Sequence, residues 1–127
     1  MSYIIKSGKN SAWEKHLRNN LLSEVIMYEK VVVNYSHAKM LTKIVAKVIN
    51  WAKRGDLHSR RLSLRYLDNR KNNLSFCKEI NSQIKMIDKL FNILGKRYQN
   101  RPGGYTRIIR TANRKGDNSP TVVFSLV

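Results

Sequence analysis

Residues 36–56 read SHAKMLTKIVAKVINWAKRGD, and this stretch decides the architecture of the chain. Its apolar residues recur three and four positions apart, which is the period of an amphipathic helix. They are Ala38, Leu41, Val45, Val48, Ile49 and Ala52. Ser36 is suited to cap the start of this helix, and Gly55 with Asp56 is expected to end it. A long helix with one apolar face needs partner elements, so the flanking sequence must supply them.

On the N-terminal side, the sequence predicts a helix over residues 11–28 followed by a short strand. Ser11 and Glu14 have the spacing of a capping box. Apolar residues then recur every four positions, at Trp13, Leu17, Leu21 and Val25. The β-branched run in residues 30–35 predicts the strand. Residues 1–10 are basic and contain a glycine, which favours an extended N-terminal arm.

On the C-terminal side, the sequence predicts two more helices and two strands. A short helix over residues 57–67 should turn Leu57, Leu64 and Leu67 inward. Residues 68–82 are rich in Asn and charge, and are expected to form a loop leading into a helix. That helix has a strong apolar period and should end at Pro102-Gly103-Gly104. Its apolar residues are Ile84, Ile87, Leu90, Phe91, Leu94 and Tyr98.

Residues 105–111 and 121–127 are expected to pair as a hairpin around a polar loop, with the strand at 31–33 beside them. Asp117 is expected to fix the Gly116 turn of that loop rather than to do chemistry. The chain of 127 residues is therefore expected to be one α+β domain, residues 1–127, with helices on one face of a three-stranded sheet.

Charge limits the function more than any other property of the composition. The chain has 25 Lys and Arg against 8 Asp and Glu, a net charge of +17. Such an excess of positive charge repels itself, so we expect a polyanionic partner, most simply a nucleic acid. The sequence has no apolar run long enough to span a bilayer, which makes a membrane the less favoured partner. The single cysteine, Cys77, permits no internal disulfide and suits a reducing cytosol.

The positive charges fall into three clusters. Residues 96–116 hold seven cations and no acid: Lys96, Arg97, Arg101, Arg107, Arg110, Arg114 and Lys115. A second cluster, at a helix junction, contains Lys53, Arg54, His58, Arg60 and Arg61, and a third contains Lys6, Lys9, Lys15 and Arg18. Arg and Lys neutralise phosphates, and Tyr and Arg stack on unpaired RNA bases. Tyr105 has two open roles, stacking on a base or filling the sheet. Trp13 and Trp51 are expected to be core or packing residues rather than platforms for bases.

Enzymatic functions find little support in the residues. His16, His37 and His58 are spread over three elements without metal-ligand spacing, and Cys77 has no obvious base partner. We therefore expect no catalytic residue, no metal, no cofactor and no small-molecule substrate. Two other classes remain as alternatives. A free-standing DNA- or RNA-binding regulator would need a recognition helix and a dimer surface, and a basic nuclease would need a His or carboxylate cluster.

The motifs of the C-terminal half resemble one known family. Arg97-Tyr98, Arg101 and the run Gly103-Gly104-Tyr105-Thr106-Arg107-Ile108 follow a basic helix, and residues 114–120 read RKGDNSP. Upstream, residues 52–61 read AKRGDLHSRR, and Arg18-Asn19, Glu29 and Ala38-Lys39 match in order. This pattern resembles the bacterial large-subunit ribosomal protein seventeen family over nearly the whole chain. Val33, Asn34 and His37 depart from it.

The resemblance implies about four helices packed against a small three-stranded mixed sheet, and a structural role in translation. It implies binding to 23S rRNA near the peptide-tunnel exit, with neighbouring large-subunit ribosomal proteins as further partners. We expect a cytoplasmic location in the ribosome, with an organellar ribosome as the alternative. The residues expected to bind RNA are Lys6, Lys9, Arg18, Lys39, Lys53, Arg54, His58, Arg60, Arg61, Lys96, Arg97, Arg101, Gly103, Gly104, Tyr105, Thr106, Arg107, Arg110, Arg114 and Lys115. Arg97, Arg101 and Arg107 are the strongest of these candidates.

Overall fold

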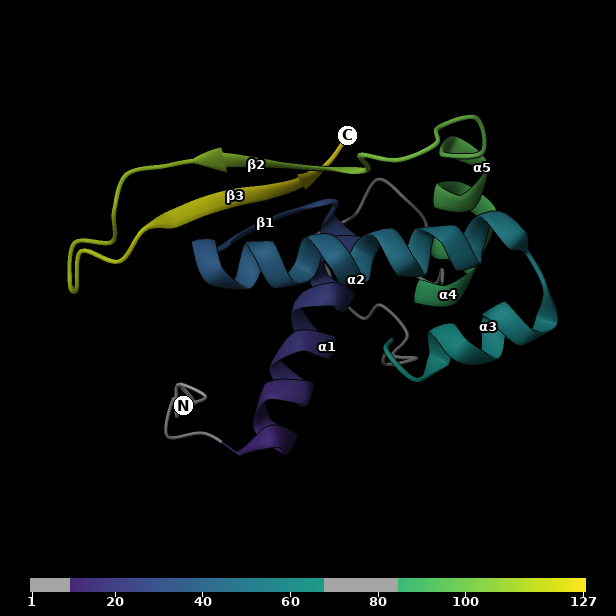
Figure 1. Ribbon diagram of the computed structural model, residues 1–127, viewed down its shortest axis with the longest axis horizontal. Coiled ribbons are helices and arrows are strands. Elements are labelled where there is room, and N and C mark those ends of the chain that lie inside the picture. Colours follow the sequence, from purple (N-terminus) through teal and green to yellow (C-terminus); the bar gives the residue numbers. More distant parts are fainter. Residues whose placement is uncertain (1–9, 68–84) are drawn as a thin grey trace, which may run out of the picture.

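The computed structural model describes residues 10–67 and 85–127. Figure 1 shows helices below a small sheet, with a long hairpin extending to one side. The elements are α1 (Ser11–Tyr28), β1 (Lys30–Asn34), α2 (Tyr35–Arg54), α3 (Leu57–Leu64), α4 (Met86–Asp88), the π-helix η1 (Lys89–Leu94), α5 (Gly95–Arg97), β2 (Thr106–Arg110) and β3 (Thr121–Leu126). The expected arm with Lys6 and Lys9, the loop at 68–82, Cys77 and Ile84 lie outside the described residues.

The sheet has three strands in the order β1-β3-β2. The predicted hairpin of the two C-terminal strands is confirmed, and the strand near residues 31–33 pairs with the last of them. Both pairings are antiparallel, so the prediction of a mixed sheet is wrong. Val32 and Ile109 both pair with Val123, and this places β3 in the middle. β1 and β2 run in the same direction, but β3 separates them, so no parallel pair forms between these strands.

Only one face of the sheet is covered by helices, as expected. Val33, Val122 and Phe124 are buried on that face, whereas Val32 is 65% exposed and Ile109 is 49% exposed on the other. This alternation is usual for an antiparallel sheet with one packed face. Ile109 is therefore not a core residue. Because neighbouring residues of a strand point to opposite faces, the basic residue next to Ile109 in β2 lies on the face toward α2.

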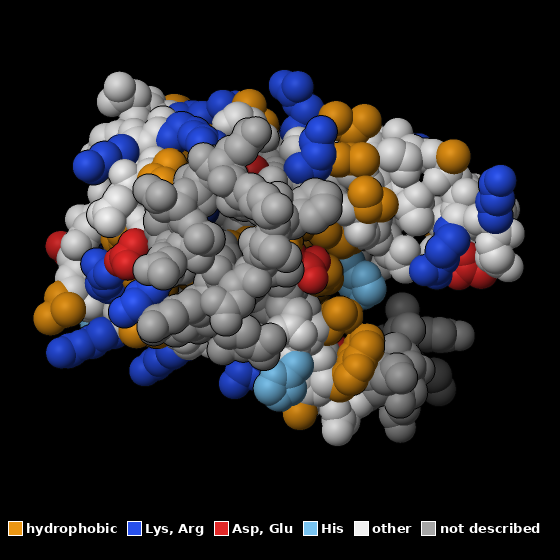
Figure 2. All heavy atoms as spheres, turned by 180° about the vertical axis from the view of Figure 1, so that it is seen from behind, with side chains coloured by type: hydrophobic (Ala, Val, Ile, Leu, Met, Phe, Trp, Pro, Cys, Tyr) orange, Lys and Arg blue, Asp and Glu red, His pale blue; other side chains and the backbone are white. Residues whose placement is uncertain are grey.

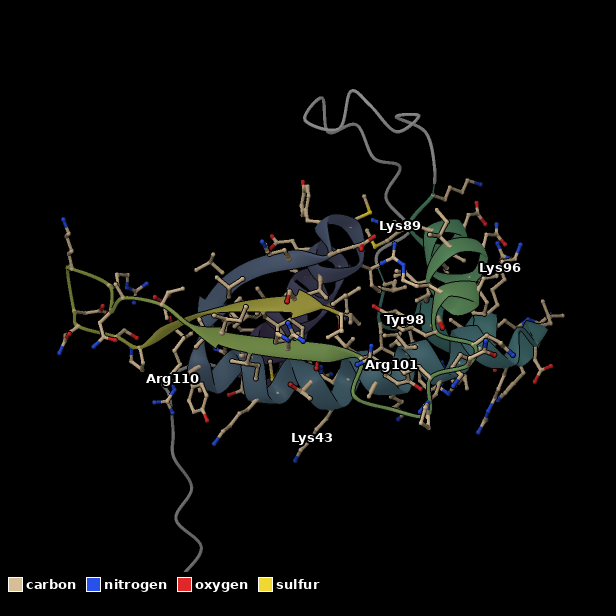
Figure 3. All side chains as sticks on the ribbon, turned by 90° about the horizontal axis from the view of Figure 1, so that it is seen from above. Lys43, Lys89, Lys96, Tyr98, Arg101 and Arg110 are labelled. Atoms are coloured by element: carbon tan, nitrogen blue, oxygen red, sulfur yellow. The ribbon has the colours of Figure 1, made fainter. Side chains whose placement is uncertain are left out.

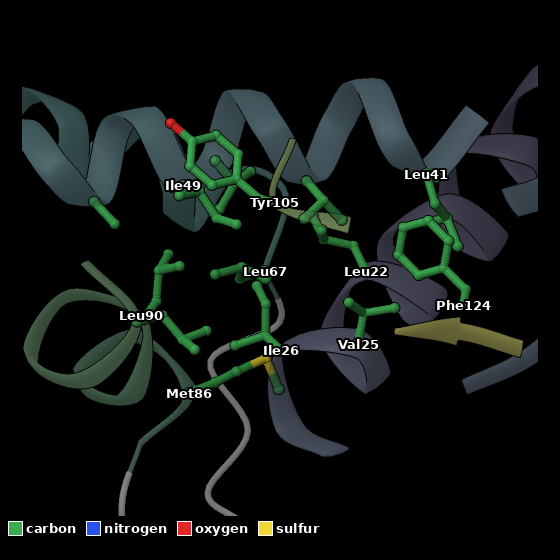
Figure 4. Packing of buried hydrophobic residues seen from close by; sticks show 14 of the residues in the cluster. Leu22, Val25, Ile26, Leu41, Ile49, Leu67, Met86, Leu90, Tyr105 and Phe124 are labelled. Atoms are coloured by element: carbon green, nitrogen blue, oxygen red, sulfur yellow. The ribbon is translucent and has the colours of Figure 1, made fainter. Parts of the chain in front are cut away.

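The core lies between α2, the packed sheet face, α1 and the helical stretch at 86–97 (Figure 4). All six apolar positions predicted for α2 are buried, at 5% exposure or less. Complete burial of an aliphatic side chain stabilises a fold by about 1.5–3 kcal/mol. The apolar face of α2 therefore fixes which side of this helix points to solvent.

The predicted helix near residues 84–98 is confirmed, and its centre is a π-helix. α4, η1 and α5 follow one another without a break from Met86 to Arg97. The buried residues Met86, Leu90, Leu94 and Tyr98 are spaced every four positions, which suits a helix wider than the α-helix. Gly95 lies against α2, where an added Cβ would be 2.9 Å from the carbonyl oxygen of Ala52. A glycine is therefore needed for this close approach.

The helix ends differ in detail from the predictions. The Asn10 side chain, not Ser11, caps α1 by accepting a hydrogen bond from the Trp13 amide (2.8 Å). α2 begins at Tyr35, one residue before the expected cap at Ser36, and ends at Arg54, where Gly55 follows with φ +71°. An asparagine side chain accepts from the first turn as well as serine does, which explains the shift in α1.

The inward face of α3 is made of serines rather than leucines. Leu57 and Leu64 are 65% and 43% exposed, so their predicted burial is wrong, whereas Leu67 is buried as expected. Ser59 and Ser63 are buried instead, and Ser63 Oγ donates to the Ser59 carbonyl (3.0 Å). Serines four positions apart share a helical face with Leu67, and this internal hydrogen bond removes the cost of burying a hydroxyl.

The two tryptophans have different environments. Trp51 is buried and packs against Tyr66, with 5.6 Å between ring centroids, so its packing role is confirmed. Trp13 is 43% exposed and lies outside the buried core.

Candidate nucleic-acid interface

A line of cations runs along the solvent side of α2. Lys39, Lys43, Lys47 and Arg54 are exposed, and their spacing of four and seven residues places them on one face. We call these four residues the α2 basic stripe. At 1.5 Å per residue the stripe is about 22 Å long. α2 contains no acidic residue, so no carboxylate of its own helix neutralises the stripe.

β2 extends the stripe at the N-terminal end of α2. Arg110 projects on the same side as Lys43 when the molecule is seen from above (Figure 3). The Lys39 Nζ lies 4.7 Å from the ring centroid of Tyr35, and the Arg110 Cζ lies 5.5 Å from it. Hydrogen bonds from Lys39 and then Arg110 lower the pKa of the Tyr35 hydroxyl. Two cations from separate elements therefore meet at one aromatic side chain.

At the other end of α2, Lys53 fixes the loop that precedes β2. Its Nζ donates to the Arg101 carbonyl (2.7 Å) and to the Tyr105 hydroxyl (3.3 Å). The Tyr105 hydroxyl in turn donates to Asn50 Oδ1 (3.0 Å). Gly104 has φ +66°, a conformation that favours glycine and lets the loop turn into the strand. The Arg101 side chain is held exposed beside the end of the stripe.

Tyr105 fills the core, which is one of its two expected roles. The residue is 3% exposed, and its ring packs edge-on against Tyr98 with centroids 5.2 Å apart. A base could stack on this ring only after the ring left the core.

The Arg97 guanidinium is bound by an acid from a distant part of the chain. Its two Nη atoms contact the Glu29 carboxylate at 2.5 and 3.3 Å, and Lys89 Nζ lies 3.4 Å from the same group. Burial raises the pKa of the Glu29 carboxyl, but the hydrogen bond from Arg97 and the charges of Lys89 and Arg97 bring it below the usual value. Glu29 has φ +60° at the end of α1, and its carbonyl accepts from the Leu126 amide (2.8 Å). Arg97 thus joins α1, the sheet and the helical end of the fold.

Two other candidates also have acidic partners. Arg60 contacts Asp88 Oδ1 at 2.5 Å, and Arg114 contacts both carboxylate oxygens of Asp117. The hydrogen bond from Arg114, followed by that from the Ser119 amide, lowers the pKa of Asp117 to about 2. Asp117 therefore organises the hairpin loop, in agreement with its predicted role.

The remaining cationic candidates form no ion pair with any residue of 10–67 or 85–127. They are Arg18, Lys39, Lys53, Arg54, Arg61, Lys96, Arg101, Arg107, Arg110 and Lys115. They do not share one face: Arg107 pairs with Ser125 on the open side of the sheet, whereas Arg110 faces α2. His58 is the second residue of α3, at the helix junction. Gly103 lies in the loop before β2, and Thr106 is the first residue of β2.

Sequence reasoning missed Lys43 and Lys47, which form the middle of the stripe. The signal was present, because residues 39, 43 and 47 repeat with the period of the buried residues but on the opposite face. The three charge clusters of the sequence are local groups of cations, whereas the cations of a helical stripe are separated by apolar residues.

Viewed from behind, Lys and Arg side chains outnumber acidic ones among the coloured residues of this face (Figure 2). No group of three potential metal-ligating side chains occurs among the described residues. In the same part of the chain, no helix combines the length and apolar character needed to cross a membrane.

The chain is similar to known proteins over its whole length. The family model described as "Ribosomal protein L17" matches residues 17–127. The "Large ribosomal subunit protein bL17" of Mesoplasma florum is 45% identical over 127 residues, covering 100% of both chains. The proteins of the same name from Mycoplasma capricolum and Enterococcus faecalis are 43% and 37% identical, with at least 99% of each chain covered. With these matches added to its fold and basic surface, the chain belongs to the ribosomal protein L17 family.

Proposed function

We propose that this chain is a structural constituent of the large ribosomal subunit that binds and stabilises 23S rRNA. The observation that carries the proposal is the α2 basic stripe, an acid-free row of cations continued by Arg110 and Arg101. The names of the matched relatives support the assignment to the large subunit. A role in assembly requires no catalytic group, and the chain is not an enzyme.

The mechanism follows from the rigidity of the platform. The buried face of α2 holds the exposed face in place, so the stripe presents its charges at fixed spacing. Each phosphate neutralised by Lys or Arg releases counterions, and this gives affinity that falls as salt rises. RNA segments that would repel one another can then pack against the same surface.

The family resemblance supports three finer points. The chain would lie near the peptide-tunnel exit, would contact neighbouring large-subunit ribosomal proteins, and would act in the ribosomes of the cytoplasm. The +17 charge supports the RNA contact directly, because an isolated chain with this charge lacks a compensating partner.

Sedimentation tests the proposal against the two alternatives. The tagged chain should travel with the large subunit through a sucrose gradient at physiological salt, whereas a free-standing regulator or nuclease would stay near the top. In filter binding, the purified chain should prefer a 23S rRNA transcript over a 16S rRNA transcript in the presence of competitor tRNA. Equal binding to both transcripts, with no chain in the large-subunit fractions, would refute the proposal.

A further inference from the structure

An apolar groove lies where β2 runs along α2, directly beside the α2 basic stripe (Figure 3). It is open to solvent and has a volume of about 650 Å³. Almost all of its lining surface is apolar, and two of the lining residues are lysines, whose aliphatic stems cover apolar surface. The lining residues are Lys39, Met40, Thr42, Lys43 and Ile44 of α2 and Ile108 of β2.

The wall that β2 contributes also carries free backbone groups. β2 is an edge strand, because β3 is its only neighbour within the described residues. Bonded pairs alternate along an antiparallel ladder, and the Thr111 amide donates to the Thr121 carbonyl (3.1 Å). Ile109, two positions earlier, therefore also bonds toward β3, whereas Ile108 turns its N–H and C=O to the open edge. One donor and one acceptor thus stand at the border of the groove.

The border of the groove on the α2 side is positively charged. Lys39 and Lys43 form no ion pair within the described part of the chain, and α2 holds no acidic residue. Arg110 occupies the next outward-facing position of β2, and its Cζ lies 5.5 Å from the Tyr35 ring that Lys39 also contacts. The surroundings of the groove therefore favour a ligand that carries negative charge.

We propose that this groove binds one unpaired nucleobase of RNA, an inference that rests on the proposed RNA-binding function. A face of the base packs on Met40 and Ile44, and its polar edge bonds to the free backbone groups of Ile108. The flanking phosphates contact Lys39 and Lys43. One nucleotide combines an apolar face, a polar edge and a negative charge, and the groove offers the complement of each. Because bases in a duplex are already stacked and paired, the ligand is unpaired RNA.

A strand of another protein is the main competing occupant, because an extended peptide can add to the free edge of β2. The charges favour RNA. A peptide would need acidic side chains at the positions beside Lys39 and Lys43, whereas every nucleotide carries a phosphate. Continuity favours RNA as well, since both lysines belong to the α2 basic stripe.

Two oligomers of equal charge test the contact with the base. One is a short oligoadenylate, and the other is the same ribose-phosphate chain with an abasic site in place of every adenine. Binding of the whole chain to each is measured by fluorescence anisotropy. Met40→Ala should weaken binding of the oligoadenylate about fivefold, the worth of a contact between methionine and an aromatic ring. It should leave binding of the abasic oligomer unchanged, because the phosphates of both contact the stripe.

Met40→Ala is suited to this test because it spares the fold. Met40 belongs neither to the buried core nor to the side chains packed against it, and alanine is the most favourable residue in a helix. The midpoint of urea unfolding should therefore not fall. Leu64→Ala is the matched control, since Leu64 is an exposed apolar residue of α3 outside the groove. It should bind both oligomers like the native chain.

Cross-linking within assembled subunits distinguishes RNA from a protein strand. The native chain and Met40→Ala are labelled with photo-methionine, which carries a light-activated diazirine, and are incorporated into large subunits. Irradiation of the native chain should give a cross-link to rRNA that is missing with Met40→Ala. A Met40-dependent cross-link to another protein, or none at all, would overturn the proposal.

The outcomes separate the groove from the general function. If the native chain binds rRNA but Met40→Ala binds the oligoadenylate as tightly as the native chain does, the groove assignment is wrong and the proposed function stands. Equal affinity of the native chain for the two oligomers has the same meaning. If the native chain binds neither oligomer and no rRNA, both are wrong.

Discussion

Lys43 is the most informative position for testing the stripe, because it lies midway between two other cations. Lys39 and Lys47 are each four residues away, which is about 6 Å along the helix axis. Lys39 and Lys47 also lie over aromatic rings, whereas no such contact involves Lys43 among the described residues. Lys43→Gln therefore removes two repulsions without removing a cation–π contact.

The change should stabilise the isolated protein and weaken its complex with RNA. Like charges four residues apart destabilise a helix by about 0.2–0.5 kcal/mol, so the loss of two such pairs should stabilise the protein by about 0.4–1 kcal/mol. One phosphate contact changes the slope of log affinity against log salt by about 0.7–0.9. When salt rises from about 50 to 200 mM, the native chain should therefore lose about threefold more RNA affinity than Lys43→Gln loses.

Urea unfolding at low salt measures the first effect, and filter binding to a 23S rRNA transcript over a salt series measures the second. In about 1 M salt the Debye length falls to roughly 3 Å, so the gain in stability should disappear. Lys30→Gln is the matched control, because Lys30 is exposed on the open face of the sheet, away from α2. Its effects on stability and on RNA affinity should both be smaller than those of Lys43→Gln.

An unchanged salt slope of RNA binding in Lys43→Gln, together with a lower slope in Lys30→Gln, would contradict the assignment of phosphate contacts to the α2 basic stripe. The phosphate contacts would then lie on the open face of the sheet. A loss of stability in Lys43→Gln would show instead that this lysine supports the fold.

Three further predictions concern the scaffold of the site. Gly95→Ala should destabilise the protein by about 1–3 kcal/mol in urea unfolding, because the added methyl would press on the Ala52 carbonyl. Tyr105→Phe should cost about 1–2 kcal/mol, since it leaves the hydrogen bond from Lys53 without its acceptor; a stability equal to that of the native chain would contradict this. The pKa of Glu29 is lowered in the fold, so its stabilising effect is present above the unfolded pKa of about 4.3 and is lost as pH falls through the lowered value. Glu29→Gln should therefore reduce the loss of stability that occurs as the pH falls below about 4.3. An unchanged dependence of stability on pH would argue against the ion pair.

Local periodicity predicted most of the fold, because burial of an apolar face is encoded in residue spacing. All six predicted inward residues of α2 are buried, and the strands at 30–34, 106–110 and 121–126 lie within the expected segments. The prediction failed for α3, where Leu57 and Leu64 are exposed and two serines are buried. In a helix of eight residues, the neighbouring elements and not the apolar pattern decide which face turns inward.

The total charge and the spacing of the lysines on α2 were determined by the sequence alone, since both depend only on composition and on the helical repeat. Which cations remain available to a partner was decided by the tertiary structure. Arg97 ranked among the best candidates for RNA contact, yet Glu29, 68 positions away in the sequence, binds its guanidinium. Contacts of this kind depend on how α1, the sheet and the helical stretch at 86–97 pack together, and no local pattern in the sequence records that arrangement.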